Sequence, residues 1–523
     1  MASGVGRTLM DARPSEIADG AKSKLAIAVL ALPALIKVVL HLVTYRGFGF
    51  FSDEFYCIAC SKRLDWGYVD HPPLSILLLR LDRWLLGDSL FSIRLLPALA
   101  GGAAVLLTGL LARRLGAGRF GQWLAQLCVL IAPVYLDFGH TFAMNAFDML
   151  FWLAAFYILV LIFDGGSPKL WVAFGLVTGL GLQNKITILS LGLGLVVGLV
   201  LTRQRRQFRS GWFWLGGALA GLIFLPYVLW QIPDGWPTLE FMHNARLYKM
   251  AKLSFPAYFS GQILQMHPFT LPVWLAGLGL LILSRAYRRY QTLGWCYLAA
   301  LVLFVVTGGK TYYLASAYTM LFAFGALWME QTISSKTLRV ALLTLIAAGG
   351  LVTLPVALPI LPVEAHIRYS AALGLKPNAG GERHRVGRLS QYYASMFGWE
   401  NLVGEVARVY RSLPPEDRAK CGIFCMDYHQ AGAIDYLGKK YGLPDAASGH
   451  NNYWLWGPRG SWEVEIVINR GPDDLANAFE QVSQEGFIHD ETGYVQPSEN
   501  DLSLYVVRKP KKPLVWAQLK HYD

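Results

Sequence analysis

Two adjacent acids, Asp53 and Glu54, are the first residues of this 523-residue chain whose placement suggests chemistry. They directly follow an apolar stretch rich in Gly and Phe, close to the end of the first long hydrophobic run. A carboxylate held in such a place is partly desolvated and can act as a base or hold a metal ion. We therefore predict a functional role for Asp53, in preference to that of an ordinary solvated loop residue.

Cations at the ends of apolar segments are the second group of candidates. Lys185 ends one apolar run, where a buried lysine is costly unless an anion neutralises it. Lys310 lies in a Gly-Gly-Lys-Thr-Tyr-Tyr turn, and the hydroxyls of Tyr312 and Tyr313 can bond to phosphate or sugar. The turn lacks the spacing of a nucleotide-binding P-loop. Snorkelling to a membrane surface is the alternative for both lysines, and Arg94 is a further candidate for anion binding.

The elements that must position these residues are membrane spans. Hydrophobic residues make up 54% of the chain and charged residues only 16%, which excludes a disordered protein and an ordinary soluble enzyme. Apolar runs of about 20 residues, the length that a bilayer requires, recur along the chain. We predict about eleven spans, near 25–45, 95–112, 120–136, 142–163, 170–187, 188–202, 212–231, 267–284, 292–308, 312–330 and 338–361.

The net charge of +12 follows from these spans. Four basic clusters lie in alternate gaps, around Arg113, Arg203, Arg288 and Lys336. If residues 1–24 are a cytoplasmic segment, alternation places all four clusters on the cytoplasmic side, as the positive-inside rule requires. The charge therefore indicates orientation, and we predict no nucleic-acid partner. The acids and the aromatic-rich loops then face the opposite, periplasmic side.

The remaining part of the chain divides into two predicted domains. Residues 25–362 form the transmembrane domain, and residues 363–523 have no spanning run but alternate strand-like and helical stretches. We predict a small α/β domain there, on the periplasmic side. The close pairs Cys57/Cys60 and Cys421/Cys425 fit a disulfide or simple core packing equally well.

Several motifs in one order resemble the membrane glycosyltransferases of family 39. These include the protein O-mannosyltransferases and the aminoarabinose transferase that modifies lipid A. The motifs are DE followed by GYVDHPPL and GDSLFSIRLLPAL, then HTFAMNAFDMLFW (140–152), GLGLQNK (179–185), WPTLEFMHNAR (236–246), GGKTYYLASAYTMLFAFGA (308–326), YYASMFGWE (392–400) and SGHNNYWLWGP (448–458). The resemblance implies a mostly α-helical, polytopic membrane protein of GT-C fold that takes a sugar from a polyprenyl-phosphate carrier.

The resemblance also assigns roles to the acids. Asp53 matches the first-loop acid that is thought to take the proton of the acceptor. Asp148 or Asn145 matches a second acidic position, although a helix cap explains an acid at that point as well. The predicted catalytic residues are Asp53 and Asp148. The predicted contacts to the donor phosphate and sugar are Glu54, Tyr56, His71, Arg94, Asn145, Lys185, Arg246, Lys310, Tyr312 and Tyr313.

Metal binding is implied by the resemblance alone. Relatives hold a divalent ion through an acid before Pro-Pro and a later histidine, which match Asp70 and His243 here. The sequence departs from the family at His71, where a Lys is usual, so this residue either adds a ligand or removes a phosphate contact. Tyr56 replaces a frequent Arg. One divalent metal ion and no nucleotide is the predicted cofactor requirement.

We predict a glycosyltransferase of the bacterial inner membrane, a hexosyl- or pentosyltransferase working at its periplasmic face. Its partners are a polyprenyl-phosphate-sugar donor, the bilayer, and a glycan, lipid A, another lipid or a protein as acceptor. The alternative is a lipid or sugar transporter of the cell envelope. A transporter favours paired repeats and charge at the bilayer midplane, whereas the acids here gather at span ends.

Overall fold

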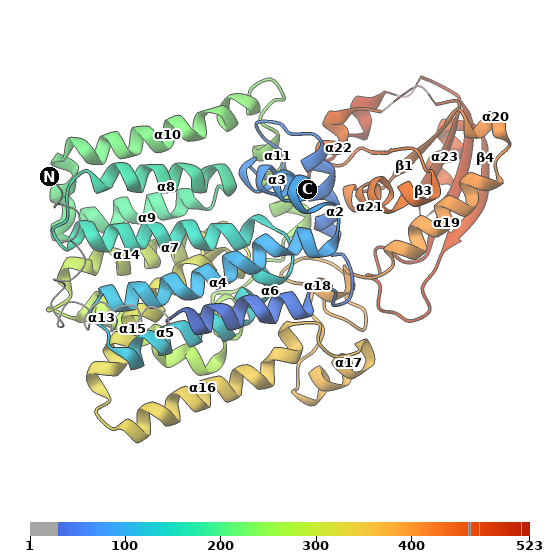
Figure 1. Cartoon of the computed structure of the whole chain (residues 1–523). Coiled ribbons are helices and arrows are strands. Elements are labelled where there is room, and N and C mark those ends of the chain that lie inside the picture. The colour runs from blue at the N-terminus through green and yellow to red at the C-terminus, as the bar shows by residue number, and fades with distance from the viewer. Residues whose placement is uncertain (1–29, 459, 461, 470, 514) are drawn as a thin grey trace, which may run out of the picture.

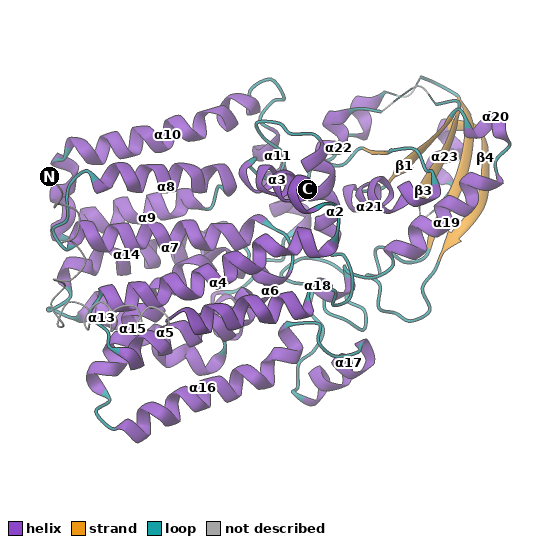
Figure 2. Ribbon diagram, viewed as in Figure 1, coloured by secondary structure: helices purple, strands orange, loops and turns teal. Residues whose placement is uncertain are grey.

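The computed structural model describes residues 30–458, 460, 462–469, 471–513 and 515–523. The predicted cytoplasmic segment 1–24 lies outside these residues. The described chain is mostly helical, with a long helical bundle at one end and a small sheet at the other (Figures 1 and 2).

Each of the eleven predicted spans overlaps a helix of the bundle. The helices are Leu30–Thr44, α4 (Leu90–Arg114), α5 (Arg119–Ile131), α6 (Pro133–His140), α7 (Met144–Phe163), α8 (Leu170–Asn184), α9 (Ile188–Leu201), α10 (Gly211–Gln231), α13 (Leu271–Leu283), α14 (Gln291–Thr307), α15 (Tyr318–Thr332) and α16 (Lys336–Ala357). Within the described residues, five helices are long and apolar enough to cross a membrane, or up to eight if each bent pair is one span. The protein is thus a multi-pass membrane protein, and the number eleven stays a prediction.

Helices pack closely where glycines meet. An added Cβ at Gly175 of α8 would lie 2.1 Å from the main-chain oxygen of Gly216 in α10. At Gly325 of α15 it would lie 1.8 Å from the oxygen of Val273 in α13. No side chain fits at either crossing. Small residues of this kind allow backbones to approach within a membrane, where apolar surface alone gives little drive for association.

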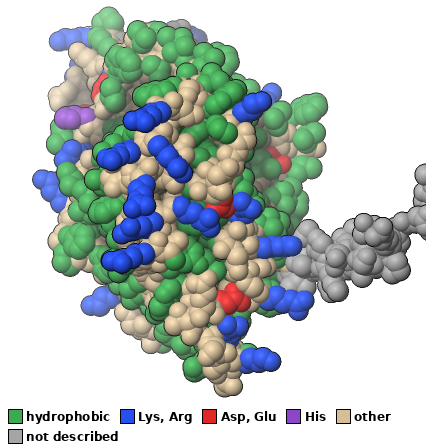
Figure 3. All heavy atoms as spheres, turned by 90° about the vertical axis from the view of Figure 1, so that its left-hand side faces the viewer, with side chains coloured by type: hydrophobic (Ala, Val, Ile, Leu, Met, Phe, Trp, Pro, Cys, Tyr) green, Lys and Arg blue, Asp and Glu red, His purple; other side chains and the backbone are tan. Residues whose placement is uncertain are grey.

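The basic clusters gather at the end of the bundle that is far from the sheet. Figure 3 looks onto this end and shows Lys and Arg side chains spread across it. Here α4 ends in Arg113 and Arg114, and the 3-10 turn at Arg203–Arg209 joins α9 to α10. Asp164 neutralises part of this charge, because its carboxylate lies 2.9 Å from Arg114 and 3.4 Å from Arg289. The arrangement is that expected from the positive-inside rule.

The other end of the bundle carries short helices and the loops that contain most of the site residues predicted from the sequence. These elements are α2 (Ser52–Lys62), α3 (Leu74–Leu86), α11 (Pro237–Asn244), a π-helical turn (Ala245–Lys249), α12 (Phe255–Met266), the 3-10 turn η5 (Thr311–Ala317), α17 (Val363–Ala372) and α18 (Gln391–Ala394). They join the bundle to the C-terminal part of the chain (Figure 1).

A five-stranded sheet with the order β2-β1-β3-β5-β4 forms the C-terminal part. The strands are β1 (Cys421–Cys425), β2 (Ala446–Ser448), β3 (Val464–Asn469), β4 (Phe479–Ile488) and β5 (Leu502–Pro510), and β1, β3 and β5 lie in stretches predicted to be strands. Strand β1 is parallel to β2 and β3, and β5 is antiparallel to β3 and β4. The helices are α19 (Trp399–Ser412), α20 (Pro415–Arg418), α21 (Tyr428–Leu437), α22 (Asn451–Trp456) and α23 (Asp473–Ala478). The domain bounds at 362/363 stay a prediction.

One hydrophobic cluster joins the two parts. It contains Phe55 and Ile58 of α2 together with Val403 of α19 and Ile434 of α21. A Cβ added at Gly432 of α21 would lie 2.9 Å from the main chain of Phe55, so the two helices touch at the backbone. Because α2 belongs to both sides, the sheet and its helices fix the direction of the segment that carries Asp53.

A buried ion pair fixes α2 against the bundle. The guanidinium of Arg94 in α4 lies 2.8 Å from the carboxylate of Glu54, and the two residues are 2% and 0% exposed. Glu54 also accepts hydrogen bonds from the main-chain N–H groups of Phe51 and Phe142, at 2.8 and 3.0 Å. Arg94 donates to the carbonyl oxygen of Gly49 at 2.8 Å. The pair therefore joins α2, α4 and the start of α7.

Loss of this pair is expected to destabilise the fold. Replacing Arg94 by Ala leaves the Glu54 carboxylate buried and unpaired, which typically costs about 3–5 kcal/mol. Thermal unfolding of Arg94→Ala in detergent should occur at a clearly lower temperature than that of the wild type. The exposed Arg80 on α3 is the matched control. An equal loss in Arg80→Ala and Arg94→Ala would contradict the assignment.

Candidate active site

A cavity of about 1990 Å³ lies between the bundle and the C-terminal part. Its wall includes Asp53 at the start of α2, Asn145 at the start of α7 and Lys185 between α8 and α9. Side chains from α9, α14 and α16, three helices of the bundle, also line it, as do residues of α21. Among the residues predicted from the sequence, Asp53, Asp70, Asn145, Lys185, His243, Arg246, Lys310, Tyr312 and Tyr313 share this wall.

Asp53 is bonded to a histidine from the far end of the chain. Its Oδ1 lies 3.0 Å from Nε2 of His429, and Nδ1 of the same ring lies 3.4 Å from Oδ1 of Asp427. The imidazole therefore lies between two carboxylates, and both acids line the cavity. Sequence analysis did not identify either His429 or Asp427.

The local sequence explains how this histidine is held. Asp427 lies two residues after the end of β1, and its side chain accepts hydrogen bonds from the N–H groups of His429 and Gln430, at 2.8 and 2.9 Å. Asp is a favoured helix N-cap, so this residue starts α21 and places His429 in its first turn. Tyr428 packs on the imidazole with 4.0 Å between ring centroids. An acid at the end of an apolar strand was the one signal that pointed to this position.

The two carboxylates keep His429 charged. Burial alone would lower the pKa of His429, but Asp427 and Asp53 outweigh burial and raise it to about 10. For Asp53, burial raises the pKa, but the hydrogen bond and charge of His429 and the charges of Lys249 and Lys310 lower it overall. At neutral pH the pair is therefore an ionised carboxylate bonded to an imidazolium. Asp53 is thus prepared to accept a proton, and its direction is fixed.

The cations occupy another part of the wall. Nζ of Lys185 donates to Oδ1 of Asn145 at 2.6 Å, and it lies 5.4 and 5.1 Å from the ring centroids of Tyr312 and Tyr313. The helix breaks at Lys185, which caps α8 before α9 begins. Within the described residues no carboxylate forms an ion pair with this lysine. Its charge is therefore available to an anion in the cavity.

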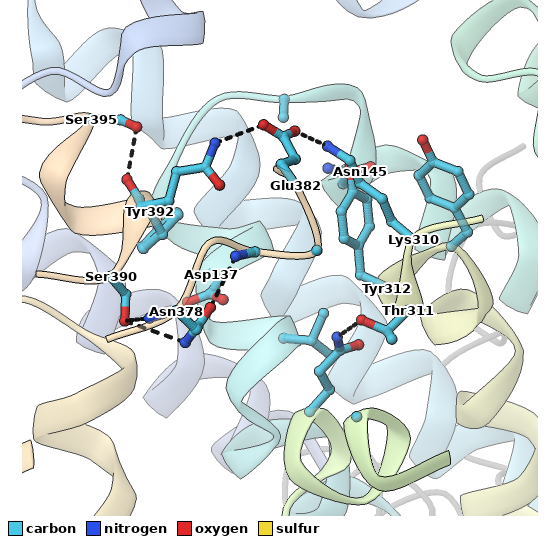
Figure 4. A pocket seen from close by; sticks show the side chains of 18 of the residues that line it. Asp137, Asn145, Lys310, Thr311, Tyr312, Asn378, Glu382, Ser390, Tyr392 and Ser395 are labelled. Carbon is cyan, nitrogen blue, oxygen red and sulfur yellow. Dashed lines mark hydrogen bonds and ion pairs between the residues drawn. The ribbon is translucent and has the colours of Figure 1, made fainter. Parts of the chain in front are cut away.

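Lys310 has a carboxylate partner. Its Nζ bonds to Glu382, which also lies 2.8 Å from His384 and accepts a hydrogen bond from Gln391 at 2.8 Å. Figure 4 shows Lys310 meeting Glu382 at the cavity wall, with Tyr312 beside the lysine. Burial raises the pKa of the Glu382 carboxyl, but His384, Lys310 and Lys249 hold it well below its usual range. The lysine is therefore fixed in direction, and its neighbour Glu382 was not predicted from the sequence.

Asp148 does not reach the cavity wall. It is 2% exposed and accepts hydrogen bonds from Ser316 at 2.8 Å and Thr187 at 3.1 Å. It thereby links α7 to η5 and to the residue before α9. The catalytic role of Asp148 stays a prediction, and the contacts described here give it a supporting role in the packing of these elements. Asn145, one turn earlier on α7, faces the cavity instead.

Four predicted donor contacts are also buried away from the wall. Glu54 and Arg94 form the ion pair described above, and His71 is 2% exposed with its Nδ1 3.0 Å from the oxygen of Pro72. The hydroxyl of Tyr56 lies 3.0 Å from Asp70 and 2.9 Å from Asn452. Their role as donor ligands stays a prediction, and packing directs all four side chains into the protein. Tyr56 instead positions Asp70, which does line the cavity.

The predicted metal ligands Asp70 and His243 line the cavity, and Nε2 of His71 lies 3.9 Å from Oδ1 of Asp70. Among the described residues, one group of three side chains could hold a metal ion. It consists of His450, His521 and Asp523. The pair Asp70 and His243 therefore stays a prediction. All four cysteines of the close pairs are buried free thiols, and burial raises the pKa of Cys421 to about 12.

Comparison with known proteins gives matches over part of the sequence and over nearly all of the fold. Residues 70–230 match the family described as dolichyl-phosphate-mannose-protein mannosyltransferase. An undecaprenyl phosphate-alpha-4-amino-4-deoxy-L-arabinose arabinosyl transferase of Pseudomonas fluorescens is 32% identical over 180 residues. This alignment covers 32% of each chain, so it spans about a third of the length of the relative.

Solved structures of ArnT from Cupriavidus metallidurans match along almost the whole chain. The apo structure has a TM-score of 0.58 at 14% identity and covers 93% of this chain and 98% of its own. A second structure, bound to undecaprenyl phosphate, has a TM-score of 0.59 at 15% identity, with 91% and 97% covered. The chain has the fold of ArnT. Together with the sequence matches, this confirms the predicted resemblance to GT-C glycosyltransferases of family 39.

The histidine between the two acids should make stability depend on pH. Its pKa rises from 6.5 to about 10 on folding, so its contribution is complete below pH 6.5 and lost as pH rises toward 10. We expect His429→Gln to unfold at a lower temperature than the wild type at pH 6.5, with the difference narrowing by pH 10. Thermal unfolding across this range tests the expectation. The exposed His489, paired with Asp501, is the control, and a pH-independent difference for His429→Gln would contradict it.

Proposed function

We propose that this protein is a glycosyltransferase that moves a single sugar from a polyprenyl-phosphate donor to an acceptor hydroxyl. The observation that carries the proposal is that one cavity, walled partly by helices of the membrane bundle, holds both the ionised Asp53 and the lysines 185 and 310. A base and a phosphate-binding group are the two functions that such a transfer requires. The matched family and relative are named for dolichyl phosphate and undecaprenyl phosphate, and one matched structure is bound to undecaprenyl phosphate, which supports this donor class.

The donor phosphate is proposed to bind at Lys185 and Lys310. Both ammonium groups lie beside the ring of Tyr312, with Nζ of Lys185 5.4 Å and Nζ of Lys310 5.8 Å from its centroid, so one anion beside this ring can meet both. The hydroxyls of Tyr312 and Tyr313 can donate to phosphate or sugar oxygens beside them. As the sugar leaves, negative charge grows on the phosphate oxygen, and fixed cations stabilise that charge most strongly in a site shielded from water.

The isoprenoid tail is proposed to lie along the apolar part of the same wall. Leu189 of α9, Leu303 and Phe304 of α14 and Val352 and Val356 of α16 line it. These helices belong to the bundle, and exposed leucines elsewhere on its surface, such as those of α10, are suited to contact lipid. A lipid tail can therefore remain in an apolar environment while its phosphate meets the lysines.

Asp53 is proposed to take the acceptor proton. The acceptor oxygen bonds to the anomeric carbon as the bond from that carbon to the phosphate oxygen breaks. The electron pair of the broken bond leaves with the polyprenyl phosphate, and the hydroxyl proton moves to Asp53. Attack from the face opposite the phosphate inverts the anomeric centre, as the family resemblance implies. His429 positions the carboxylate and holds it ionised until the proton arrives.

The activation resides in the phosphate ester, so the proposal needs no nucleotide. A divalent ion at Asp70 and His243 remains part of the proposal. We also propose that the bundle end with the arginine clusters is cytoplasmic, which places the cavity and residues 363–523 at the periplasmic face of the inner membrane.

The sugar and the acceptor are to be identified by incubating the purified protein with a panel of polyprenyl-phosphate sugars and envelope extracts, followed by mass spectrometry. Transport of a lipid without transfer would favour the transporter alternative.

Replacing the proposed base should remove transfer but not donor binding. Asp53→Asn keeps the size of the side chain and removes its ability to accept a proton, so we expect the transfer rate to fall about 100- to 10,000-fold. The affinity for the polyprenyl-phosphate sugar, measured by equilibrium binding, should change little. Asp65→Asn, in an exposed loop of the same segment, is the control. Full activity of Asp53→Asn would refute the proposed role.

Removing the lysine without an ion-pair partner should weaken donor binding. Lys185→Met keeps the apolar stem and removes one charge-assisted contact, for which we expect a loss of about 10- to 100-fold in affinity for the donor. The same variant should bind the unphosphorylated polyprenol as the wild type does. Lys169→Met, at the exposed opposite end of the bundle, serves as the control. Unchanged donor affinity in Lys185→Met would exclude this lysine from the phosphate site.

A further inference from the structure

The last residues of the chain dock at the junction between the bundle and the C-terminal part. Lys520 pairs with Glu240 of α11 at 2.6 Å, and the main-chain oxygen of Tyr522 accepts a hydrogen bond from Asn244 at 2.8 Å. On the other side, the N–H of His521 donates to the oxygen of Gly449 at 3.0 Å. This segment therefore holds the two parts together. It also brings His521 and Asp523 to His450, just before α22.

Three side chains at this junction have the chemistry of a metal site. One ligand atom from each of His450, His521 and Asp523 lies within 4.8 Å of the others. Nε2 of His450 is 3.0 Å from Oδ1 of Asp523, and the two imidazole rings are 4.2 Å apart between centroids. The ligand atoms of a tetrahedral zinc ion, each about 2.0–2.2 Å from the metal, are about 3.3–3.6 Å from one another. Small side-chain movements bring the three atoms to this spacing.

The surroundings of the two histidines favour a ligand role. Nδ1 of His521 lies 3.4 Å from the main-chain oxygen of Leu519, and an N–H donated there leaves Nε2 with a free lone pair. His450 is 6% exposed, and its Nδ1 has no hydrogen-bond partner among the described residues. Its Nε2 lies 3.0 Å from Oδ1 and 3.2 Å from the main-chain oxygen of Asp523, so Nε2 is the nitrogen that faces the acidic ligand.

We propose that His450, His521 and Asp523 bind a zinc ion at the wall of the cavity. Two imidazoles and one carboxylate are a donor set that zinc prefers, and three protein ligands leave a fourth position open. His450 and Asp523 line the cavity, so the open position faces it. The charge of Lys249 acts on Asp523 and competes with the ion for this carboxylate. The site is separate from Asp70 and His243, and it does not depend on the proposed glycosyltransferase activity.

Zinc binding by the purified protein tests the site directly. The full chain, free of any polyhistidine tag and treated with a chelator, is titrated with zinc chloride by calorimetry, and its zinc content is measured after dialysis. We expect the wild type to bind zinc and His521→Ala to lose one equivalent or at least about tenfold in affinity. His521 is exposed, so its replacement should preserve the fold. Asp523→Asn is a second variant with nearly unchanged shape, and thermal unfolding verifies that both are folded.

Two control variants distinguish this site from others. His489→Ala removes an exposed histidine elsewhere on the C-terminal part and should leave zinc binding unchanged. His243→Ala removes the histidine that was predicted from the sequence to bind a metal together with Asp70. It should also leave the zinc ion at His450, His521 and Asp523 bound. Equal zinc binding by the wild type, His521→Ala and Asp523→Asn would overturn the proposal. Failure of the titrated wild type to bind zinc would overturn it as well. Either result would mean that His450 and Asp523 form only an ion pair.

Discussion

The architecture of the cavity depends on one buried ion pair, between Glu54 and Arg94. Two opposite charges are costly to remove from water, and main-chain groups of Phe51, Phe142 and Gly49 compensate by forming hydrogen bonds to this pair. It fixes the N-terminal turn of α2 against α4 and the start of α7. Since α2 winds by about 100° per residue, fixing Glu54 inward directs Asp53 out of the protein and into the cavity. The buried acid Glu54 thus determines the direction of its neighbour Asp53.

The second constraint comes from the opposite direction. His429 reaches Asp53 because α21 and α2 pack backbone against backbone at Gly432 and Phe55. The hydrophobic cluster shared by the bundle and the C-terminal part therefore has an electrostatic purpose as well as a packing one. It holds a positive charge beside a carboxylate that burial alone would tend to protonate. Packing and electrostatics act here on the same pair of atoms.

Much of the fold was predictable because a bilayer imposes a length and a composition on each span. The same reasoning identified Asp53, Lys185 and Lys310, which are polar groups at the ends of apolar runs. It failed where direction mattered: sequence does not reveal that Glu54, Arg94 and Asp148 turn into the protein. It also failed for His429, because contacts between residues 376 positions apart leave no local pattern. The N-cap at Asp427 indicates where α21 begins, but it does not indicate that His429 in the first turn will contact Asp53.

The position of His429 has a consequence for the making of the protein. Ribosomes deliver the bundle, with Asp53 and both lysines, long before they deliver α21. Until the last quarter of the chain has been synthesised and folded, Asp53 has neither its histidine partner nor the part of the cavity wall that α21 supplies. The cavity is therefore completed only when the C-terminal part has folded against α2.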